Sequence, residues 1–254
     1  MSIGGEERPE GERSVGEIMS SVFSIYSSHF AEVALPFILA GLVSGFFSYT
    51  TYALIPVGEM VSGGGYSDPS VIMESVGRLM LSVFFFALIS MVVYLICGGM
   101  VVKFASDVIE TGKGSVQQSF DETIARFPSL IAVSLVTSLL TGVGFILLIA
   151  PGVILAIIFS LTIPVVMIER RGALESLGRS QRLVEGHWKK TFALLLMVGA
   201  LIGTVGLLTV IFSRPPSPLA IVLSTVIGSV IDPLYFIAIT VLYHSMIIRE
   251  QVGV

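Results

Sequence analysis

The sequence predicts an all-α protein that crosses a membrane several times. Of its 254 residues, 54% are hydrophobic and only 13% are charged, about half the charged share of a soluble domain. Six apolar runs come close to or exceed the roughly 20 residues that a membrane-spanning helix needs. They lie near 32–54, 79–102, 129–149, 152–168, 191–212 and 218–247. This pattern excludes a cytosolic globular enzyme, and the net charge of -4 argues against nucleic acid as a partner.

The chain reads as a single membrane domain over 14–248, with a short tail over 249–254. Residues 1–13 are polar and of mixed charge, so we expect a disordered leader rather than a cleaved signal peptide. The loop over 55–78 is too short and too simple in composition to be a catalytic domain.

Two prolines shape the expected third and fourth helices. The third and fourth apolar runs are separated only by Ala150-Pro151-Gly152, which predicts a tight turn and a helical hairpin. Pro164 predicts a kink near the end of the short fourth helix.

The basic residues predict the orientation in the membrane. With six spans, all but two of the 14 Lys and Arg residues fall on one side, in 1–31, 103–128, 169–190 and the tail. Arg78 and Arg214 are the two on the other side. Because cytoplasmic loops carry the excess of basic residues, we expect both termini in the cytoplasm.

We expect three pseudo-repeated hairpins, each preceded by a cytoplasmic amphipathic helix. The repeats cover about 14–110, 115–168 and 172–248. Each start has apolar residues at helical spacing, as in Val116, Phe120 and Ile124 of the second. Such helices should lie in the membrane interface or pack under the bundle. The alternative is chance similarity, which compositional bias produces in apolar sequences.

Serine caps and glycine spacing support the repeat. Ser14 with Glu17 and Ser115 with Gln118 fit the capping box at a helix start. Glycines recur after each start at Gly41, Gly142 and Gly199, and then at Gly45, Gly144 and Gly203. Gly41 with Gly45 and Gly199 with Gly203 are four residues apart, a spacing that lets helices approach closely, either within one chain or between copies.

The segment 169–190 is a candidate surface for lipid headgroups. Its basic residues would attract anionic lipids at about 1 kcal/mol each near the surface. They are Arg170, Arg171, Arg179, Arg182, Lys189 and Lys190. Glu175 with Arg179 and Glu185 with Lys189 also have the spacing of helical ion pairs. The alternative is that these charges only set the topology.

Asp232 is the candidate intramembrane polar site. It lies near the middle of the last apolar run, directly before Pro233. It shares a face of small residues with Ala220, Ser224 and Gly228, and we expect this face to meet a neighbouring helix. An ionisable side chain at this depth usually faces a bundle interior or a cavity. Three interpretations remain: an ion, proton or substrate site, a structural acid bonded to another span, or a position near the outer interface.

No pattern of catalytic or metal-binding residues is visible. Cys97 is the single cysteine, and the three histidines, which we expect at the surface, are not at metal-ligand spacing. No nucleophile elbow or phosphate-binding glycine loop occurs. We therefore expect no cofactor.

Several motifs carry a family resemblance. They are Pro151-Gly152, the helix end Pro164–Glu169, Gly172-Ala173-Leu174-Glu175, Arg179-Ser180, Gly186 with Trp188, the N-terminal SVGEIMSSVF, and Leu242-Tyr243 before Arg249. The chain resembles, over nearly its whole length, the membrane domain found beside glycerophosphodiester phosphodiesterases and its stand-alone prokaryotic relatives. The resemblance implies a fold and a membrane location without esterase activity, because the chain has no separate catalytic barrel. Relatives often have an acidic residue soon after the final tyrosine, where this chain has His244-Ser245.

The sequence thus predicts a non-enzymatic module of a prokaryotic plasma membrane. Membrane lipids are the expected partners, with a second copy or another membrane protein as further candidates. The alternative is a channel or transporter whose pathway includes Asp232.

Overall fold

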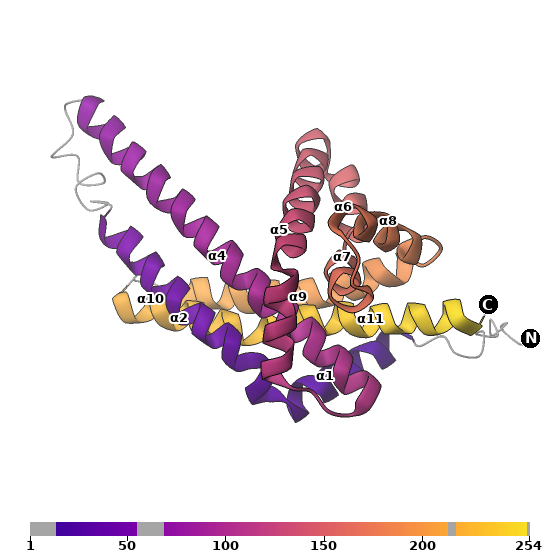
Figure 1. Ribbon diagram of the computed structural model, residues 1–254. Helices are drawn as coiled ribbons and strands as arrows, with labels where there is room; N and C mark the ends of the chain where they lie inside the picture. Colours follow the sequence, from indigo (N-terminus) through magenta and orange to yellow (C-terminus); the bar gives the residue numbers. More distant parts are fainter. Residues whose placement is uncertain (1–13, 55–68, 213–216, 253–254) are drawn as a thin grey trace, which may run out of the picture. The chain divides into compact units, whose positions relative to one another are not determined.

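The computed structural model describes residues 14–54, 69–212 and 217–252, and these residues form helices and no strand (Figure 1). The helices are α1 (Val15–Ser28), α2 (Phe30–Leu54), α4 (Pro69–Thr111), α5 (Val116–Leu147), α6 (Ile149–Ile158), α7 (Thr162–Pro164), the π-helix η1 (Val165–Glu169), α8 (Ala173–Val184), α9 (Trp188–Phe212), α10 (Pro218–Ile231) and α11 (Pro233–Val252). Six stretches are long and apolar enough to cross a membrane, which confirms the predicted class and number of spans.

The chain forms two compact units. Unit 1 comprises Met1–Val33, Gly98–Leu201 and Pro233–Val254, and unit 2 comprises Ala34–Cys97 and Ile202–Asp232. The boundaries fall inside α2, α4 and α9 and at the junction of α10 with α11. These boundaries differ from those of the three predicted repeats, which stay a prediction.

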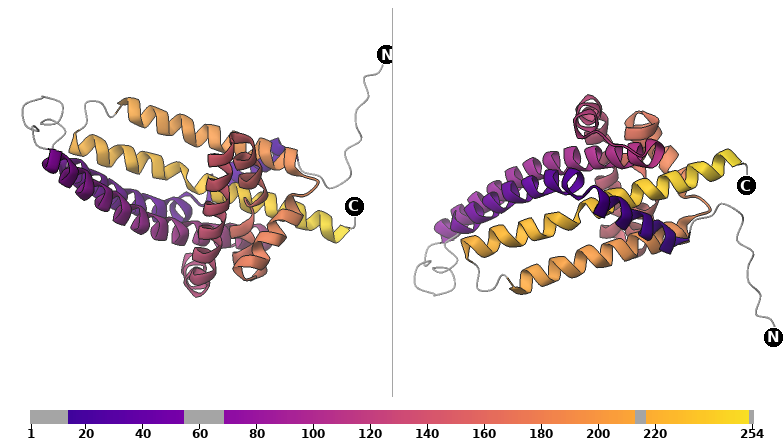
Figure 2. Two further views of the ribbon diagram at one scale, coloured as in Figure 1. Left: turned by 90° about the horizontal axis from the view of Figure 1, so that it is seen from above. Right: turned by 90° about the horizontal axis from the view of Figure 1, so that it is seen from below.

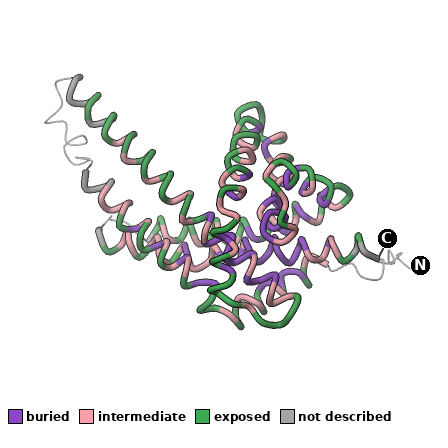
Figure 3. Tube along the Cα trace, in the orientation of Figure 1, coloured by how far each residue is buried: buried purple, intermediate pink, exposed green. Residues whose placement is uncertain are grey.

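Helix α11 is the centre of the unit 1 core (Figure 3). Every residue from Phe236 to Tyr243 is almost completely buried, including Thr240, whose hydroxyl donates to the Phe236 carbonyl at 2.7 Å. A helix buried on all sides occupies the interior of a bundle. Helix α1 packs against it, and Ile18 and Val22 of α1 are completely buried.

The first predicted capping box is present at the start of α1. The Ser14 backbone N–H donates to Glu17 Oε2 at 2.6 Å, and the Glu17 N–H donates to Ser14 Oγ at 3.2 Å. At the start of α5, Ser115 caps the helix, but the Gln118 side chain donates to Glu122 instead of back to Ser115. The second box is therefore only half formed.

The second predicted amphipathic helix is not a separate element. Helix α5 continues without a break from Val116 into the third span, and Pro128 is accommodated inside it. The predicted apolar stripe of Val116, Phe120 and Ile124 is exposed, whereas Ser119 and Thr123 on another face are buried. The buried face of α5 lies close to α4 at Gly99, which has no side chain. A Cβ on Gly99 would lie 2.7 Å from the Thr123 methyl carbon.

The hairpin of α5 and α6 turns at Leu148, two residues before the predicted Ala150-Pro151-Gly152 turn (Figure 1). Leu148 has an extended backbone, and Pro151 lies in the first turn of α6, where its missing N–H costs nothing. The two helices touch at Gly144 and Gly152, where a Cβ on Gly144 would lie 2.9 Å from the Gly152 Cα.

The fourth span is broken one turn before Pro164. Helix α6 ends at Ile158, and the chain turns before α7 and η1. Proline removes a backbone donor from a helix, and a side chain of α8 binds the backbone groups exposed at this break. Ser180 Oγ donates to the Ile158 carbonyl at 2.6 Å and accepts from the Leu161 N–H at 3.2 Å.

Candidate functional site

Unit 2 is built from four helical segments that run side by side (Figure 2). They are the unit 2 parts of α2, α4 and α9, together with α10. Glycines on α2 allow α10 to approach closely, because a Cβ on Gly45 would lie 3.1 Å from the Val222 Cα. An edge-to-face contact between Phe37 and Tyr94, with ring centroids 5.7 Å apart, joins α2 to α4.

A cavity of about 540 Å³ lies within unit 2. Ligand sites typically have volumes of about 300–1,000 Å³ and mostly apolar walls with a few polar groups. Its lining residues come from all four segments and are Phe37, Ala40, Gly41, Ser44, Ala87, Ser90, Met91, Val93, Tyr94, Ile202, Gly206, Thr225, Gly228, Ser229 and Asp232. This cavity is the candidate functional site.

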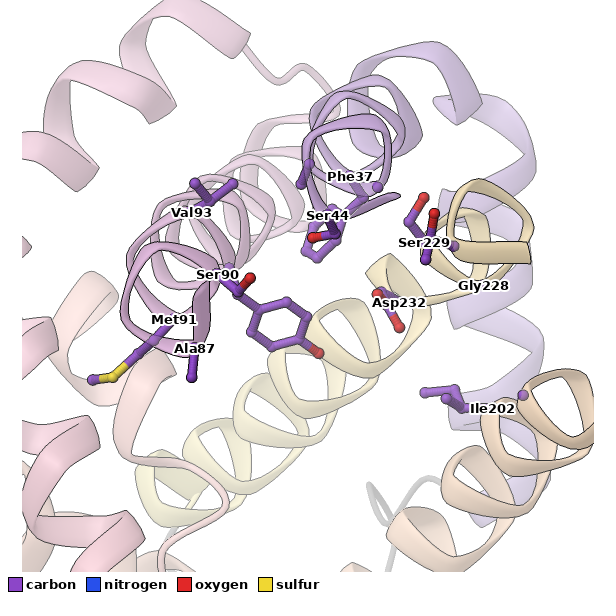
Figure 4. A pocket seen from close by; sticks show the side chains of 15 residues that line it. Phe37, Ser44, Ala87, Ser90, Met91, Val93, Ile202, Gly228, Ser229 and Asp232 are labelled. Atoms are coloured by element: carbon purple, nitrogen blue, oxygen red, sulfur yellow. The ribbon is translucent and has the colours of Figure 1, made fainter. Parts of the chain in front are cut away.

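The Asp232 carboxylate belongs to the cavity wall (Figure 4). The residue follows the last residue of α10 and precedes Pro233 at the start of α11. It is near the middle of the 30-residue apolar stretch Leu219–Ile248. Among the described residues, no hydrogen bond or ion pair to this carboxylate forms, and no group of three metal-ligating side chains occurs.

The face of α10 that contacts α2 is not the predicted face but a neighbouring one. We expected Ala220, Ser224, Gly228 and Asp232 to meet a neighbouring helix, but a Cβ on Gly228 would enter open space. The residues that approach α2 are Val222, Thr225 and Ser229. Gly228 and Asp232 consequently face the cavity.

Hydroxyl groups supply most of the other polarity of the cavity. Thr225 Oγ1 donates to the Val222 carbonyl at 2.8 Å, and Ser229 Oγ donates to the Val226 carbonyl at 2.8 Å. Ser90 Oγ is buried without a hydrogen-bond partner among the described residues. Because the Thr225 and Ser229 hydroxyl protons already have acceptors, these two groups offer lone pairs to a ligand.

The predicted headgroup residues have divergent environments in unit 1. Arg179 is mostly buried, with 13% of its side chain exposed, and its guanidinium contacts two carboxylates. Arg171 Nε donates to Glu169 at 2.5 Å, and Arg170 lies 3.6 Å from Glu122. Arg182 and Lys189 are exposed. Lys190 is half-buried and makes an interaction within the protein.

Glu169 is the hub of a polar cluster that the sequence reasoning missed. Its carboxylate accepts hydrogen bonds from Arg171, from Arg179 Nε at 2.7 Å and from the Tyr243 hydroxyl at 3.1 Å. Arg179 in turn binds Glu250, and these hydrogen bonds hold the pKa of Glu250 below its usual value. The predicted pairing of Arg179 with Glu175 does not form, because Glu169 and Glu250 bind the guanidinium.

A second missed cluster surrounds His244, which we expected at the surface. Only 13% of its side chain is exposed, and Nε2 lies 3.0 Å from Ser106 Oγ and 3.8 Å from Glu110 Oε1. A catalytic triad needs the acid and the serine on opposite ring nitrogens, whereas here both approach Nε2. Ser106 is 138 residues away in sequence, so no local pattern signals the contact.

No protein-family model and no solved structure matches the chain. Three bacterial proteins do, each described as a UPF0259 membrane protein, from the Tuc7, 5A and APS strains of Buchnera aphidicola subsp. Acyrthosiphon pisum. Each is 32% identical over 91 residues, or 36% of this chain and 36% of the relative. The chain thus covers about a third of the length of these relatives.

The similarity to these relatives and the six long apolar helices both indicate a membrane protein. The chain is a multi-pass membrane protein of prokaryotic type. The relatives' descriptions name a membrane protein and no activity, and none of the three names a glycerophosphodiester phosphodiesterase.

Proposed function

We propose that this protein is a non-enzymatic membrane module that binds a lipid or another amphipathic molecule in the cavity of unit 2. The cavity of about 540 Å³ is the observation that carries the proposal. Its wall combines aliphatic and aromatic side chains with one carboxylate and a few hydroxyls. Such a wall suits a ligand with an apolar body and one polar group.

The depth of the site favours a ligand that partitions into the bilayer. Asp232 is near the middle of its apolar stretch, so a ligand beside it must leave water. Apolar burial contributes about 25 cal/mol per Å² of surface removed from water. A molecule with an apolar body therefore gains most from this site.

The test is to fill the cavity with a side chain. A Cβ on Gly228 would enter open space beside Asp232, so Gly228→Leu places three further carbons in the cavity without displacing the backbone. Gly203→Leu is the matched control, because it also enters open space in unit 2 and does not line the cavity. Native mass spectrometry of the purified protein would measure retained molecules.

We expect small amphipathic molecules to copurify with the wild type and the Gly203→Leu variant and to be lost from Gly228→Leu. Equal retention by both variants would refute binding in this cavity. Folding of each variant would be checked by circular dichroism and thermal denaturation, so that loss of ligand is separated from loss of structure.

The second candidate function is a channel or transporter, which the exposure of the Asp232 carboxylate to the cavity favours. Ionisable groups at membrane depth commonly mark ion and substrate pathways. Ion and proton flux into liposomes would be compared for the wild type and Asp232→Asn. Flux that falls in the variant supports a pathway, whereas flux equal to that of empty liposomes in both argues for a binding module.

We also propose that the exposed part of the basic segment contacts anionic headgroups. Arg182 and Lys189 have the exposure that this role needs, and Arg170 is exposed although it lies near Glu122. Neutralising these three residues should weaken binding to anionic liposomes, whereas Arg179→Gln should act mainly on stability. Unchanged liposome binding in the triple variant would refute headgroup contact.

We further propose that the protein is related to the membrane domain of the phosphodiesterase group. We also propose that it lies in the plasma membrane with both termini in the cytoplasm. The distribution of Lys and Arg supports this orientation. Reporter fusions at each terminus, active on only one side of the membrane, would test it. A reporter that is active outside at either end would refute the orientation.

A further inference from the structure

Three polar groups of the cavity in unit 2, those of Asp232, Thr225 and Ser229, present hydrogen-bond acceptors. An ionised carboxylate only accepts. The Thr225 and Ser229 hydroxyls already donate to carbonyls of their own helix, so they too present lone pairs. A ligand that matches this wall must bring donors of its own.

Among the described residues, no cationic side chain lies beside the Asp232 carboxylate, and the lining of the cavity includes no Lys, Arg or His. Within the described part of unit 2, Arg78 is the basic residue, and it pairs with Glu74 on its own helix. Removing a carboxylate from water without a partner is costly, and a cationic ligand would offset that cost.

The aromatic ring of Tyr94, which is 41% exposed, is a further part of the cavity wall that suits a cation. Phe37 and Tyr94 both line the cavity and contact each other edge to face. The face of an aromatic ring attracts an ammonium group, and the attraction grows when the cation is desolvated. The carboxylate, the lone pairs and the Tyr94 ring therefore select the same kind of ligand.

We propose that the cavity binds an organic ammonium ion with an apolar body, with Asp232 as its counter-charge. This inference rests on the proposed binding function and names its ligand class. The ammonium group contacts the Asp232 carboxylate and the hydroxyl oxygens, while the apolar body lies against Ala87, Met91 and Ile202. The ammonium comes either from a free amine or from the headgroup of an aminophospholipid.

The test compares three probes that differ only in their polar group: hexylammonium, hexanol and hexanoate. Their binding to the protein in phosphatidylglycerol nanodiscs at neutral pH would be measured by isothermal titration calorimetry. We expect hexylammonium to bind about tenfold more tightly than hexanol, a difference of about 1.4 kcal/mol, and hexanoate to bind most weakly. Asp232→Asn should abolish the preference for hexylammonium and leave the affinity for hexanol unchanged.

Glu74→Gln is the matched charge control. It removes one carboxylate from unit 2 at an exposed position outside the cavity, so the preference should persist. A general effect of net charge would reduce the preference equally in both variants and would overturn the inference. If Asp232→Asn fails to fold, Gly228→Leu decides, because filling the cavity should abolish the preference for hexylammonium, whereas attraction to the anionic lipid would persist.

The outcomes separate the inference from the proposed function. Equal affinities for the three probes, all lost in Gly228→Leu, would overturn the ammonium ligand and leave the binding function intact. Absence of binding by every probe, with no molecule retained on purification, would overturn both. Where hexylammonium is preferred, weaker binding in phosphatidylethanolamine nanodiscs than in phosphatidylglycerol would identify the headgroup as the source, and equal binding would identify a free amine.

Discussion

The Arg179 guanidinium binds the Glu250 carboxylate through two parallel hydrogen bonds, of 2.8 Å from Nη1 and 2.5 Å from Nη2. These contacts raise the pKa of Arg179 above its usual value. The same guanidinium donates from Nε to Glu169, so one arginine joins η1, α8 and α11. Bidentate pairs of this kind are among the stronger ionic contacts in proteins, and they fix the end of α11 against α8.

Stability should depend on pH through Glu250. Its pKa is lowered by the hydrogen bonds from Arg179, so its contribution is present above the unfolded-state pKa and is lost as the pH falls through the folded-state pKa. Glu250 is half exposed, so the effect should be about 0.2–1 kcal/mol. Thermal denaturation of the wild type and Glu250→Gln should differ at about pH 7 and converge at about pH 3. A difference independent of pH would contradict this assignment, and Glu185→Gln serves as the exposed control.

Tyr243→Phe should destabilise unit 1 by about 1.5–3 kcal/mol, because a hydrogen bond to a charged group is lost. The hydroxyl donates to Glu169 at 3.1 Å, and the ring is almost fully buried. Phenylalanine keeps the volume, so packing is preserved. Chemical denaturation in detergent would measure the change. Combining Tyr243→Phe with Glu169→Gln should cost less than the sum of the single changes; strict additivity would show that the two residues are not coupled.

Ser180→Ala removes one hydroxyl group but should destabilise the protein more than the loss of a single exposed hydroxyl would. The Ser180 hydroxyl binds two backbone groups at the break in the fourth span, and the serine is fully buried. Leaving buried polar groups without partners costs about 1–3 kcal/mol. Ser21→Ala is the control, since its exposed hydroxyl bonds only to the Glu17 carbonyl on the same helix. Equal unfolding midpoints for the two variants would contradict the role of Ser180.

Gly45→Leu should destabilise unit 2 by about 1–3 kcal/mol, as expected for overpacking. A Cβ at this position would press against the backbone of α10 at Val222, which cannot move aside without shifting the helix. Gly203→Leu meets open space and should be neutral or slightly stabilising, because leucine favours helices more than glycine does. Thermal denaturation of both variants would show the contrast, and a neutral Gly45→Leu would exclude close packing there.

Much of the architecture follows from local sequence. Apolar runs of spanning length gave the six membrane helices, because bilayer thickness sets the length of an apolar helix. Ser14 and Glu17 predicted the start of α1 because a capping box needs only residues three apart. The position of Asp232 near the middle of the long apolar stretch Leu219–Ile248 also followed from the sequence, and its depth in the membrane stays a prediction.

The tertiary structure determines which neighbouring groups such residues contact. Gly41 with Gly45 and Gly199 with Gly203 have the same spacing, yet only the first pair packs against another helix, because the neighbour of a helix face is set by the fold. Likewise, the environment of Asp232 depends on side chains from three other segments, and His244 meets Ser106 across 138 residues. Local sequence determines where helices start, end and cross the bilayer, while packing between distant segments determines which polar groups are paired and which face a cavity.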